Sequence, residues 1–340
     1  GKTLCLYAGL ALIAIGSGGI KPCVSAFMGD QFGPGQSHLL QKAYGAFYWA
    51  INFGSFFSFL AIPWCKDRWG YGVAFGVPGV LMALATLIFW LGTRHYVRVP
   101  PSRRSRPAGF FRVLGHALRA RRAPGAAFWD AALGRFSPRE VDAARSVPPL
   151  LFVFALVPAF WALFDQTSST WVLQGQRMVP ARLLGLSIGA EQMQSANALL
   201  VMLLVPLFTL LVYPRIGRLA APLNRMSAGM FLGAGSYLIV AAIQTRIEAG
   251  AQLSVLVQFA PYVVLTAAEV LISTTGLEFA FREAAPEMKS TIMSFWLLTV
   301  AFGNLLVAWI TRTFGDGSHS GSVSASRFLL YAGLTFAVAV

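Results

Sequence analysis

Long apolar runs separated by short polar segments are the feature that most constrains the fold of this chain. A helix needs roughly 20 apolar residues to cross about 30 Å of hydrocarbon. Each backbone group left unpaired in lipid costs several kcal/mol, so such runs favour helices. The sequence therefore predicts an all-α polytopic membrane protein with nine spans, near 3–26, 44–64, 71–93, 147–171, 191–213, 227–245, 253–281, 290–311 and 326–340.

The composition supports a membrane protein and argues against other classes. Hydrophobic residues make up 56% of the chain and charged residues 12%, whereas soluble domains are about 25% charged. The net charge of +14 is also typical of nucleic-acid binding, but 12 of the 27 Lys and Arg residues fall between Arg94 and Arg145. Three scattered cysteines are too few for a disulfide framework or a zinc site. No nucleotide-binding, hydrolase or metalloprotease motif is found, so the sequence indicates neither an enzyme nor a metal or cofactor site.

The distribution of cations predicts the orientation. Cytoplasmic loops carry an excess of Lys and Arg, which places the basic segment 94–146 in the cytoplasm and Gly1 on the outer side. The chain enters a helix at once and has no initiator Met, so we expect further helices upstream.

Segment 94–146 is expected to contain short helices. Residues 110–122 form a basic amphipathic pattern in which Phe111, Leu114 and Leu118 share one face. A second short helix is expected over 126–136, followed by a capping box formed by Ser137 and Glu140. The segment either braces two helical bundles or only fixes the topology through its arginines.

Three ionisable side chains stand inside apolar surroundings: Lys21, Asp165 and Glu269. Each costs about 2.5–3.5 kcal/mol near the membrane centre on insertion scales, so we expect them to face a wet interior cavity. Lys21 could instead extend to the cytoplasmic surface, and the two acids could belong to a structural network. All four histidines lie in loops or at span ends, so proton coupling within this chain would use carboxyl groups, whose neutral form is favoured by desolvation.

Amide and aromatic side chains complete the predicted cavity. Tyr48 and Asn52 are four residues apart and share one helical face. Asn197 interrupts an apolar run, Trp161 lies one turn before Asp165, and Trp296 lies within its span. Each tryptophan could equally face lipid or pack in a core.

Several motifs resemble the proton-dependent oligopeptide transporter family of the major facilitator superfamily. Residues 16–27 and 29–32 resemble its fourth helix and residues 47–55 its fifth. Residues 160–166, 261–279, and 288–290 with 296–300 resemble the seventh, tenth and eleventh helices, respectively. The family fold has twelve helices in two six-helix bundles. The resemblance thus implies a partial N-terminal bundle over 1–93 (helices four to six), a linker over 94–146, and a C-terminal bundle over 147–340 whose last helix is truncated.

The resemblance also implies substrate contacts. Lys21 would meet the carboxylate of a peptide or pair with an acid, and Glu269 would receive the amino group. Asn52 and Asn197 would hold the peptide backbone, with Tyr48 beside them. A zwitterionic di- or tripeptide needs a cation and an anion set apart, which agrees with this division of roles.

The remaining candidates would couple and shape the site. Asp165 would be the acid whose protonation is linked to gating, together with Glu269 and Lys21, and Trp161 and Trp296 would line side-chain pockets. Residues 167–171 read TSSTW, where the family often has QGSRW. The family's first-helix motif Glu-x-x-Glu-Arg is absent with helices one to three, so this chain alone is not expected to transport.

The sequence therefore predicts a multi-pass transporter of the cell membrane that imports di- and tripeptides with protons by alternating access. Its partners would be the peptide, protons and the lipid bilayer, without a cofactor and without nucleic acid. Two alternatives remain open. The same fold could carry another small anion or zwitterion, such as nitrate or an amino acid, or the chain could be a non-transporting scaffold or fragment.

Overall fold

The structure is a computed structural model. It describes residues 2–29, 31–98, 109–120, 125, 127–183, 185–217, 221–283, 285, 288–314 and 323–340. Within these ranges it describes the backbone alone at residues 2, 21–22, 25–26, 29, 34, 37–38, 40–42, 44–45, 186, 277–278, 280–282, 289–290 and 314. The chain forms two compact units, one of Gly1–Gly54 with Ala61–Arg103 and one of Ser55–Leu60 with Arg104–Val340.

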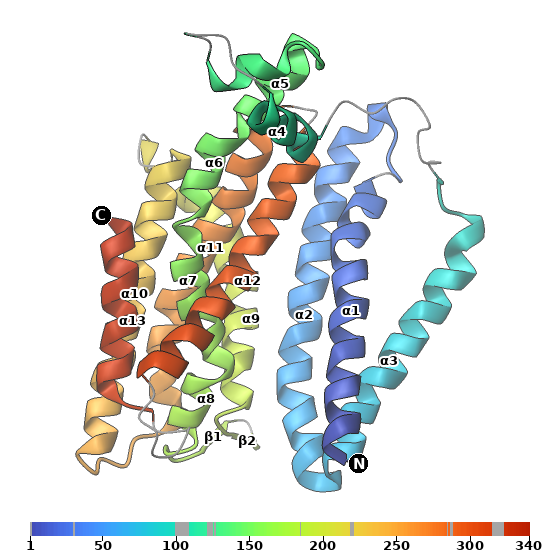
Figure 1. The fold of residues 1–340 in the computed structure, drawn as a ribbon. Coiled ribbons are helices and arrows are strands. Elements are labelled where there is room, and N and C mark those ends of the chain that lie inside the picture. The colour runs from blue at the N-terminus through green and yellow to red at the C-terminus, as the bar shows by residue number, and fades with distance from the viewer. Residues whose placement is uncertain are drawn as a thin grey trace. The chain divides into compact units, whose positions relative to one another are not determined.

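Three long helices account for most of the first unit (Figure 1). They are α1 (Lys2–Gly29), α2 (Ser37–Trp69) and α3 (Tyr71–Leu91), with the 3-10 turns η1 (Pro34–Gln36) and η2 (Gly92–Arg94). Gly70 alone separates α2 from α3, and its φ of 82° lies in the left-handed region that glycine adopts without strain.

An aromatic cluster ties the end of α1 to the end of α3. Phe27 lies 5.4 Å from Phe89 and 5.1 Å from Tyr96 between ring centroids. Next to this cluster, the Gln31 side chain donates to the Val97 carbonyl at 3.2 Å and accepts from the Val97 amide at 2.9 Å. These contacts hold the segment that follows α3 against the segment that follows α1.

The second unit is a bundle of helices with short helices of the linker at one end (Figure 1). The linker elements are α4 (Phe110–Arg119), η3 (Phe128–Ala132) and α5 (Pro138–Arg145). The bundle elements are α6 (Val147–Phe154), α7 (Val157–Phe164), η4 (Asp165–Ser168), α8 (Thr170–Gly175), η5 (Gln192–Gln194), α9 (Ser195–Leu207), the π-helical turn η6 (Phe208–Val212), α10 (Pro222–Glu248), η8 (Val255–Gln258), α11 (Phe259–Glu283), α12 (Lys289–Phe314) and α13 (Ala325–Ala339).

The all-α membrane architecture is confirmed. Within the described residues, seven helices are long and apolar enough to span a membrane, and an eighth span is possible if a bent pair counts as one. The ninth expected run corresponds to α13, a shorter apolar helix. Large apolar side chains are exposed along these helices, and on α3 the one buried side chain is Ala74. Such surfaces suit helices whose neighbours are lipid tails.

The span expected over 147–171 is broken in the structure. The helical stretches Pro138–Phe154 and Val157–Gly175 meet at an angle of 44°. Pro158 lies in the first turn of α7, where its missing N–H removes a backbone hydrogen bond and its ring opposes continuation of α6. The chain then passes through the 3-10 turn η4 before α8.

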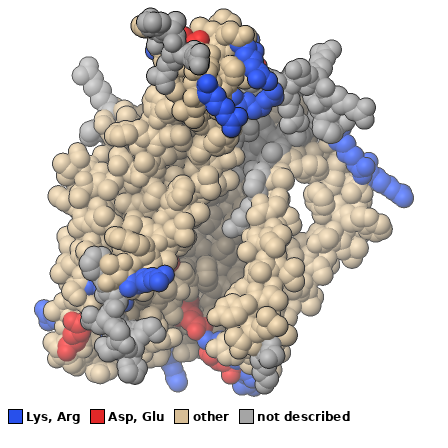
Figure 2. All heavy atoms as spheres, in the orientation of Figure 1, with Lys and Arg blue, Asp and Glu red and all other residues tan. Residues whose placement is uncertain are grey.

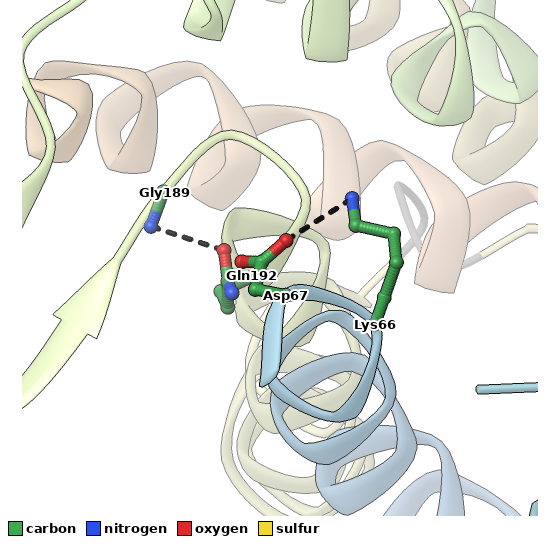
Figure 3. Close-up of polar contacts among 4 residues, drawn as sticks. All are labelled: Lys66, Asp67, Gly189 and Gln192. Carbon is green, nitrogen blue, oxygen red and sulfur yellow. Dashed lines mark hydrogen bonds and ion pairs between the residues drawn. The ribbon is translucent and has the colours of Figure 1, made fainter. Parts of the chain in front are cut away.

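A short antiparallel hairpin, β1 (Ala181–Leu183) with β2 (Leu186–Ile188), connects α8 to the elements before α9. Gly185 in its turn has a φ of 82°, a conformation typical of hairpin turns. After the hairpin, the Gly189 amide donates to the Gln192 side chain at 3.1 Å (Figure 3). The backbone amide before the hairpin is also paired, because Val179 N donates to Leu253 O at 2.8 Å.

Aromatic residues fill the core of the second unit. Trp171 lies 4.9 Å from Tyr262 and 5.7 Å from Tyr237 between ring centroids, and Phe328 of α13 lies 5.8 Å from Tyr237. The Tyr237 hydroxyl donates to the Leu163 carbonyl at 2.5 Å, so α10 supplies a partner to the last turn of α7, just before η4.

Buried glutamines fasten the hairpin end of the bundle. Gln174 Nε2 donates to Gln244 Oε1 at 3.1 Å and to Val240 O at 3.2 Å. Gln258 Nε2 donates to Gln174 Oε1 at 3.1 Å and to Trp171 O at 2.9 Å. A buried network with paired donors and acceptors links α8, α10 and η8 into one rigid body.

The structure describes short helical elements in the linker, as the sequence predicts. The face of α4 that packs into the core carries Phe110, Val113 and Ala117, whereas Phe111 and Leu118 are exposed. Within the helix expected over 126–136 lies the 3-10 helix η3, where the Asp130 side chain accepts from the Ala127 amide at 3.0 Å.

The capping box predicted at the start of α5 is confirmed. Ser137 Oγ accepts from the Glu140 amide, and the Glu140 carboxylate accepts from the Ser137 amide at 2.9 Å. The two side chains pair donors that a helix start otherwise leaves without partners.

Candidate functional site

The 3-10 turn η4, between α7 and α8, places Asp165 within the second stretch of the bent span. Asp165 is the first residue of η4, directly after α7 ends at Phe164. Its side chain is half-buried. Asn304 of α12 donates to Asp165 Oδ2 at 2.6 Å, a short charge-assisted contact when the acid is ionised. The acid predicted from the sequence is therefore held by an amide from another helix.

A glycine makes that contact possible. A Cβ added at Gly303 would lie 2.7 Å from Trp161 Cβ, 2.9 Å from Ala162 N and 3.0 Å from Pro158 O. The backbone of α12 therefore touches the backbone of α7 at Gly303. The residue that follows, Asn304, reaches Asp165 from this position.

The second predicted acid, Glu269, lies in the middle of α11 and is hydrogen-bonded to α9. Asn197 Nδ2 donates to Glu269 Oε2 at 2.8 Å and to Thr266 Oγ1 at 3.1 Å. The structure thus brings together Asn197 and Glu269, which the sequence proposed separately as substrate contacts.

A polar stripe continues along α11 from Glu269. Thr266, Glu269 and Ser273 are three or four residues apart and so share one face. The hydroxyl oxygens of Ser273 and Thr275, and Nε1 of Trp161, are buried without a hydrogen-bond partner among the described residues. Unpaired buried polar groups are costly, and a polar ligand would supply the missing partners.

Trp296 of α12 is buried against the same helix. Its indole ring lies on Gly276, where an added Cβ would collide with the ring, and its centroid is 5.4 Å from that of Phe154. Its side chain is 3% exposed. Trp161 is only half-buried. Of the two predicted pocket tryptophans, Trp161 therefore has more of its surface accessible in this conformation.

The other predicted site residues belong to the first unit. Asn52 Nδ2 donates to the Tyr48 carbonyl at 2.9 Å, so the two share one face of α2 as expected. Asn52 is half-buried, and Tyr48 is 40% exposed. Lys21 lies in α1, and its side chain falls outside the described residues. The roles suggested for these three residues stay predictions.

The ion pair between Lys66 and Asp67 lies outside the site and is partly exposed. At the end of α2, Lys66 Nζ lies 3.8 Å from Asp67 Oδ1 (Figure 3). The Asp67 side chain is 69% exposed, so this ion pair contributes little to stability. Among the described residues, no group of three or more His, Cys, Asp or Glu side chains is arranged to hold a metal ion.

Sequence reasoning missed three residues of the site: Thr266, Ser273 and Asn304. Thr266 and Ser273 could have been found from their spacing of three and four residues from Glu269. Asn304 could have been found as an amide inside an apolar run, as Asn197 was. Its partner Asp165 lies 139 residues away, so the sequence alone could not pair them.

Comparisons with known proteins agree on one family. A family model described as PTR2, POT family, matches residues 1–326. Solute carrier family 15 member 1 of Homo sapiens is 36% identical over 257 residues, which cover 71% of this chain and 36% of that protein. Peptide transporter family 1 of Drosophila melanogaster is 38% identical over 258 residues, covering 72% of this chain and 34% of that protein.

A solved structure extends the similarity to three dimensions. The crystal structure of the POT family transporter PepTSo superposes with a TM-score of 0.89 at 38% identity, covering 98% of this chain and 76% of that chain. This chain spans about a third of the length of the curated relatives that it matches.

Proposed function

This chain belongs to the POT family and has the all-α fold of major facilitator transporters, and on that premise we propose that it acts in proton-coupled import of di- and tripeptides. The transport cycle would be alternating access, with protons as the coupling ion and no cofactor. Relatives described as peptide transporters support this substrate class. The protein would lie in the cell membrane with segment 94–146 in the cytoplasm.

The observation that carries the proposal is the pairing of Glu269 with Asn197 inside the bundle. A carboxyl group within a membrane span is costly unless it is paired or used. Glu269 is held by one amide and stands on a stripe whose next hydroxyl, Ser273, has no partner among the described residues. This arrangement suits a cationic amino group beside hydrogen-bonding groups, as the N-terminus of a peptide requires.

We assign the remaining roles by the same reasoning. Asn197 and Asn52 would contact the peptide backbone, Tyr48, Trp161 and Trp296 would contact its side chains, and Lys21 would meet its carboxylate. Asp165, held by Asn304 in η4, would take up and release the coupled proton together with Glu269. Residues 1–93 and 147–340 would contribute to the two bundles that alternate around the site.

Uptake into proteoliposomes that contain the full-length protein carrying this sequence tests the proposal. An inward proton gradient should drive accumulation of labelled dialanine, and Glu269→Gln should reduce it at least tenfold because a neutral amide cannot bind the amino group or a proton. Glu283→Gln is the matched control on the same helix, since Glu283 is exposed at the end of α11, and it should keep activity near that of the parent.

Three outcomes would refute the proposal. Dialanine counterflow that ignores both the imposed pH gradient and Glu269→Gln would exclude the mechanism. Uptake of nitrate or a single amino acid that dialanine fails to inhibit would assign the fold to another solute. Reconstituted protein that moves none of these solutes would favour a scaffold.

A further inference from the structure

The linker contains a basic pocket that the transport mechanism does not use. The pocket has a volume of about 370 Å³ and lies between α4 and the turn after η3. Its lining includes four basic side chains, Arg112, His116, Arg119 and Arg135, and two aromatic ones, Phe111 and Phe136. The His116 ring packs edge-on against Phe136, with 5.6 Å between centroids, which gives the pocket a firm wall.

Among the described residues, the arginines of this pocket have no acidic partner. Arg112, His116 and Arg119 are spaced by four and three residues and so project from one face of α4. The guanidinium groups of Arg112, Arg119 and Arg135 form no ion pair or hydrogen bond within the part of the chain that the structure describes. Figure 2 shows Lys and Arg side chains gathered around the α4–α5 end of the view. Unpaired guanidinium groups that share one pocket attract an anion with several acceptor oxygens.

Nearby acids are engaged elsewhere. Asp130 accepts from the Ala127 amide at 3.0 Å, and Glu140 accepts from the Ser137 amide at 2.9 Å. Both carboxylates therefore cap helical turns. Neither carboxylate forms an ion pair with Arg112, Arg119 or Arg135 among the described residues.

The position of α4 places the pocket at the end of a membrane span. Phe110 and Phe111 pack on Phe295 of α12, with centroid distances of 6.0 and 5.9 Å. Phe295 lies about one turn into the apolar stretch Thr291–Thr313. Phospholipid phosphates lie just outside the hydrocarbon, which is the depth that this contact gives to α4.

An exposed apolar ridge accompanies the basic face. Phe111 is 68% exposed and Leu118 is 65% exposed. The two residues are seven apart, so they lie on one side of α4, between the buried face and the basic face. A helix with an exposed apolar ridge beside a cationic face is typical of segments that rest at a lipid surface.

We propose that this pocket binds the phosphate-containing headgroup of an anionic phospholipid, with Phe111 and Leu118 inserted beside its acyl chains. The arginines supply bidentate donors to the phosphate oxygens. The apolar ridge selects a lipid over free phosphate, because free phosphate has no chain to cover Phe111 and Leu118. The lipid thereby fixes the linker to the membrane surface.

Native mass spectrometry of the delipidated full-length protein in neutral detergent tests this site. The protein is titrated separately with phosphatidylglycerol, phosphatidylcholine and inorganic phosphate. Arg112→Gln with Arg135→Gln should weaken phosphatidylglycerol binding about 25-fold, since each arginine near an anionic lipid contributes roughly a factor of five. The control pair Arg94→Gln with Arg145→Gln removes the same charge from exposed positions outside the pocket and should change binding less than twofold.

A further variant separates the two sources of phosphate. Leu118→Ser alters an exposed side chain, so the fold is retained, and it should weaken phosphatidylglycerol binding while leaving the weak binding of inorganic phosphate unchanged. Equal losses in the pocket and control pairs, or equal binding of phosphatidylcholine and phosphatidylglycerol, would overturn the proposal. Inorganic phosphate that binds as tightly as the lipid, with no effect of Leu118→Ser, would show a free-phosphate site instead.

Discussion

Replacing Gly303 by alanine tests the contact on which the Asp165 site depends. The new methyl group would lie 2.7 Å from Trp161 Cβ and within 3.0 Å of two backbone atoms of α7. Ordinary carbon contacts lie at 3.5–4.0 Å, so α7 and α12 would have to separate by roughly 0.5–1 Å. Backbone atoms cannot rotate away as a flexible side chain could, and the strain must therefore be taken up by the helix pair.

The magnitude follows from two opposed effects. Overpacking of a close-packed interior costs typically 1–3 kcal/mol, and close contacts with three atoms of α7, two of them backbone atoms, place Gly303→Ala near the upper end. Alanine in place of glycine favours a helix by about 1 kcal/mol. The free energy of unfolding should therefore fall by about 1–2 kcal/mol, measured by reversible unfolding in mixed micelles with increasing sodium dodecyl sulfate.

Gly235→Ala in α10 is the matched control. An added Cβ at Gly235 meets no atom within 4 Å, so this variant keeps the propensity gain without the strain and should be stabilised by about 0.5–1 kcal/mol. Gly303→Ala should also displace Asn304 from Asp165 and lower proton-driven dialanine uptake. Equal stability of the two variants would show that the approach of α7 to α12 is not tight, and the reasoning would fail.

Two further substitutions test contacts that support the site and the linker. Tyr237→Phe leaves the buried Leu163 carbonyl without its hydroxyl donor and should lower the unfolding free energy by about 1–2 kcal/mol in the same micelle titration. The control Tyr71→Phe, at a 68% exposed tyrosine, should leave the unfolding free energy unchanged. Equal effects of the two variants would contradict a stabilising role of the Tyr237 hydrogen bond. Ser137→Ala removes the acceptor of the capping box and should destabilise α5 by about 1 kcal/mol, which should be seen as faster amide hydrogen exchange at Glu140. Ser137→Asp should restore the protection of that amide. Unchanged exchange in Ser137→Ala would show that the cap is dispensable.

The helical fold could be predicted from the sequence because bilayer thickness fixes the length of each span. The break before α7 could not be predicted, although Pro158 was visible. Proline is tolerated within membrane helices when neighbours satisfy the freed backbone groups, so its presence does not decide between a kink and a break. Here Asp165 and the 3-10 turn η4 follow within two turns, and tertiary packing sets the outcome.

The buried face of α4 could not be predicted from the sequence either. Its pattern carries apolar residues on two neighbouring faces, and spacing alone does not say which of them packs against other helices. The structure buries the face with Phe110 and Val113. Packing against Phe295 of α12 decides between them, and a contact between segments far apart in the chain leaves no local pattern.

Candidate site residues could be found one by one in the sequence, but their contacts with one another could not be predicted. Asp165 and Glu269 could be found because charge within apolar runs is costly and so conspicuous. Asn197 was found by the same logic, but its bond to Glu269 joins residues 72 apart in the chain. The number of residues between two positions does not give their distance in space. The structure was therefore needed to show which asparagine donates to which carboxylate.

The choice of amides as partners has a consequence for proton coupling. Asn304 and Asn197 each donate through Nδ2 to a carboxylate oxygen. An asparagine side chain also carries an acceptor oxygen, so the same amide, turned over, can accept the O–H of a protonated carboxyl group. A lysine or arginine offers donors alone and would stabilise only the charged form. Partnered by amides, each acid can keep a hydrogen bond to its asparagine in both protonation states, as the proposed proton coupling requires.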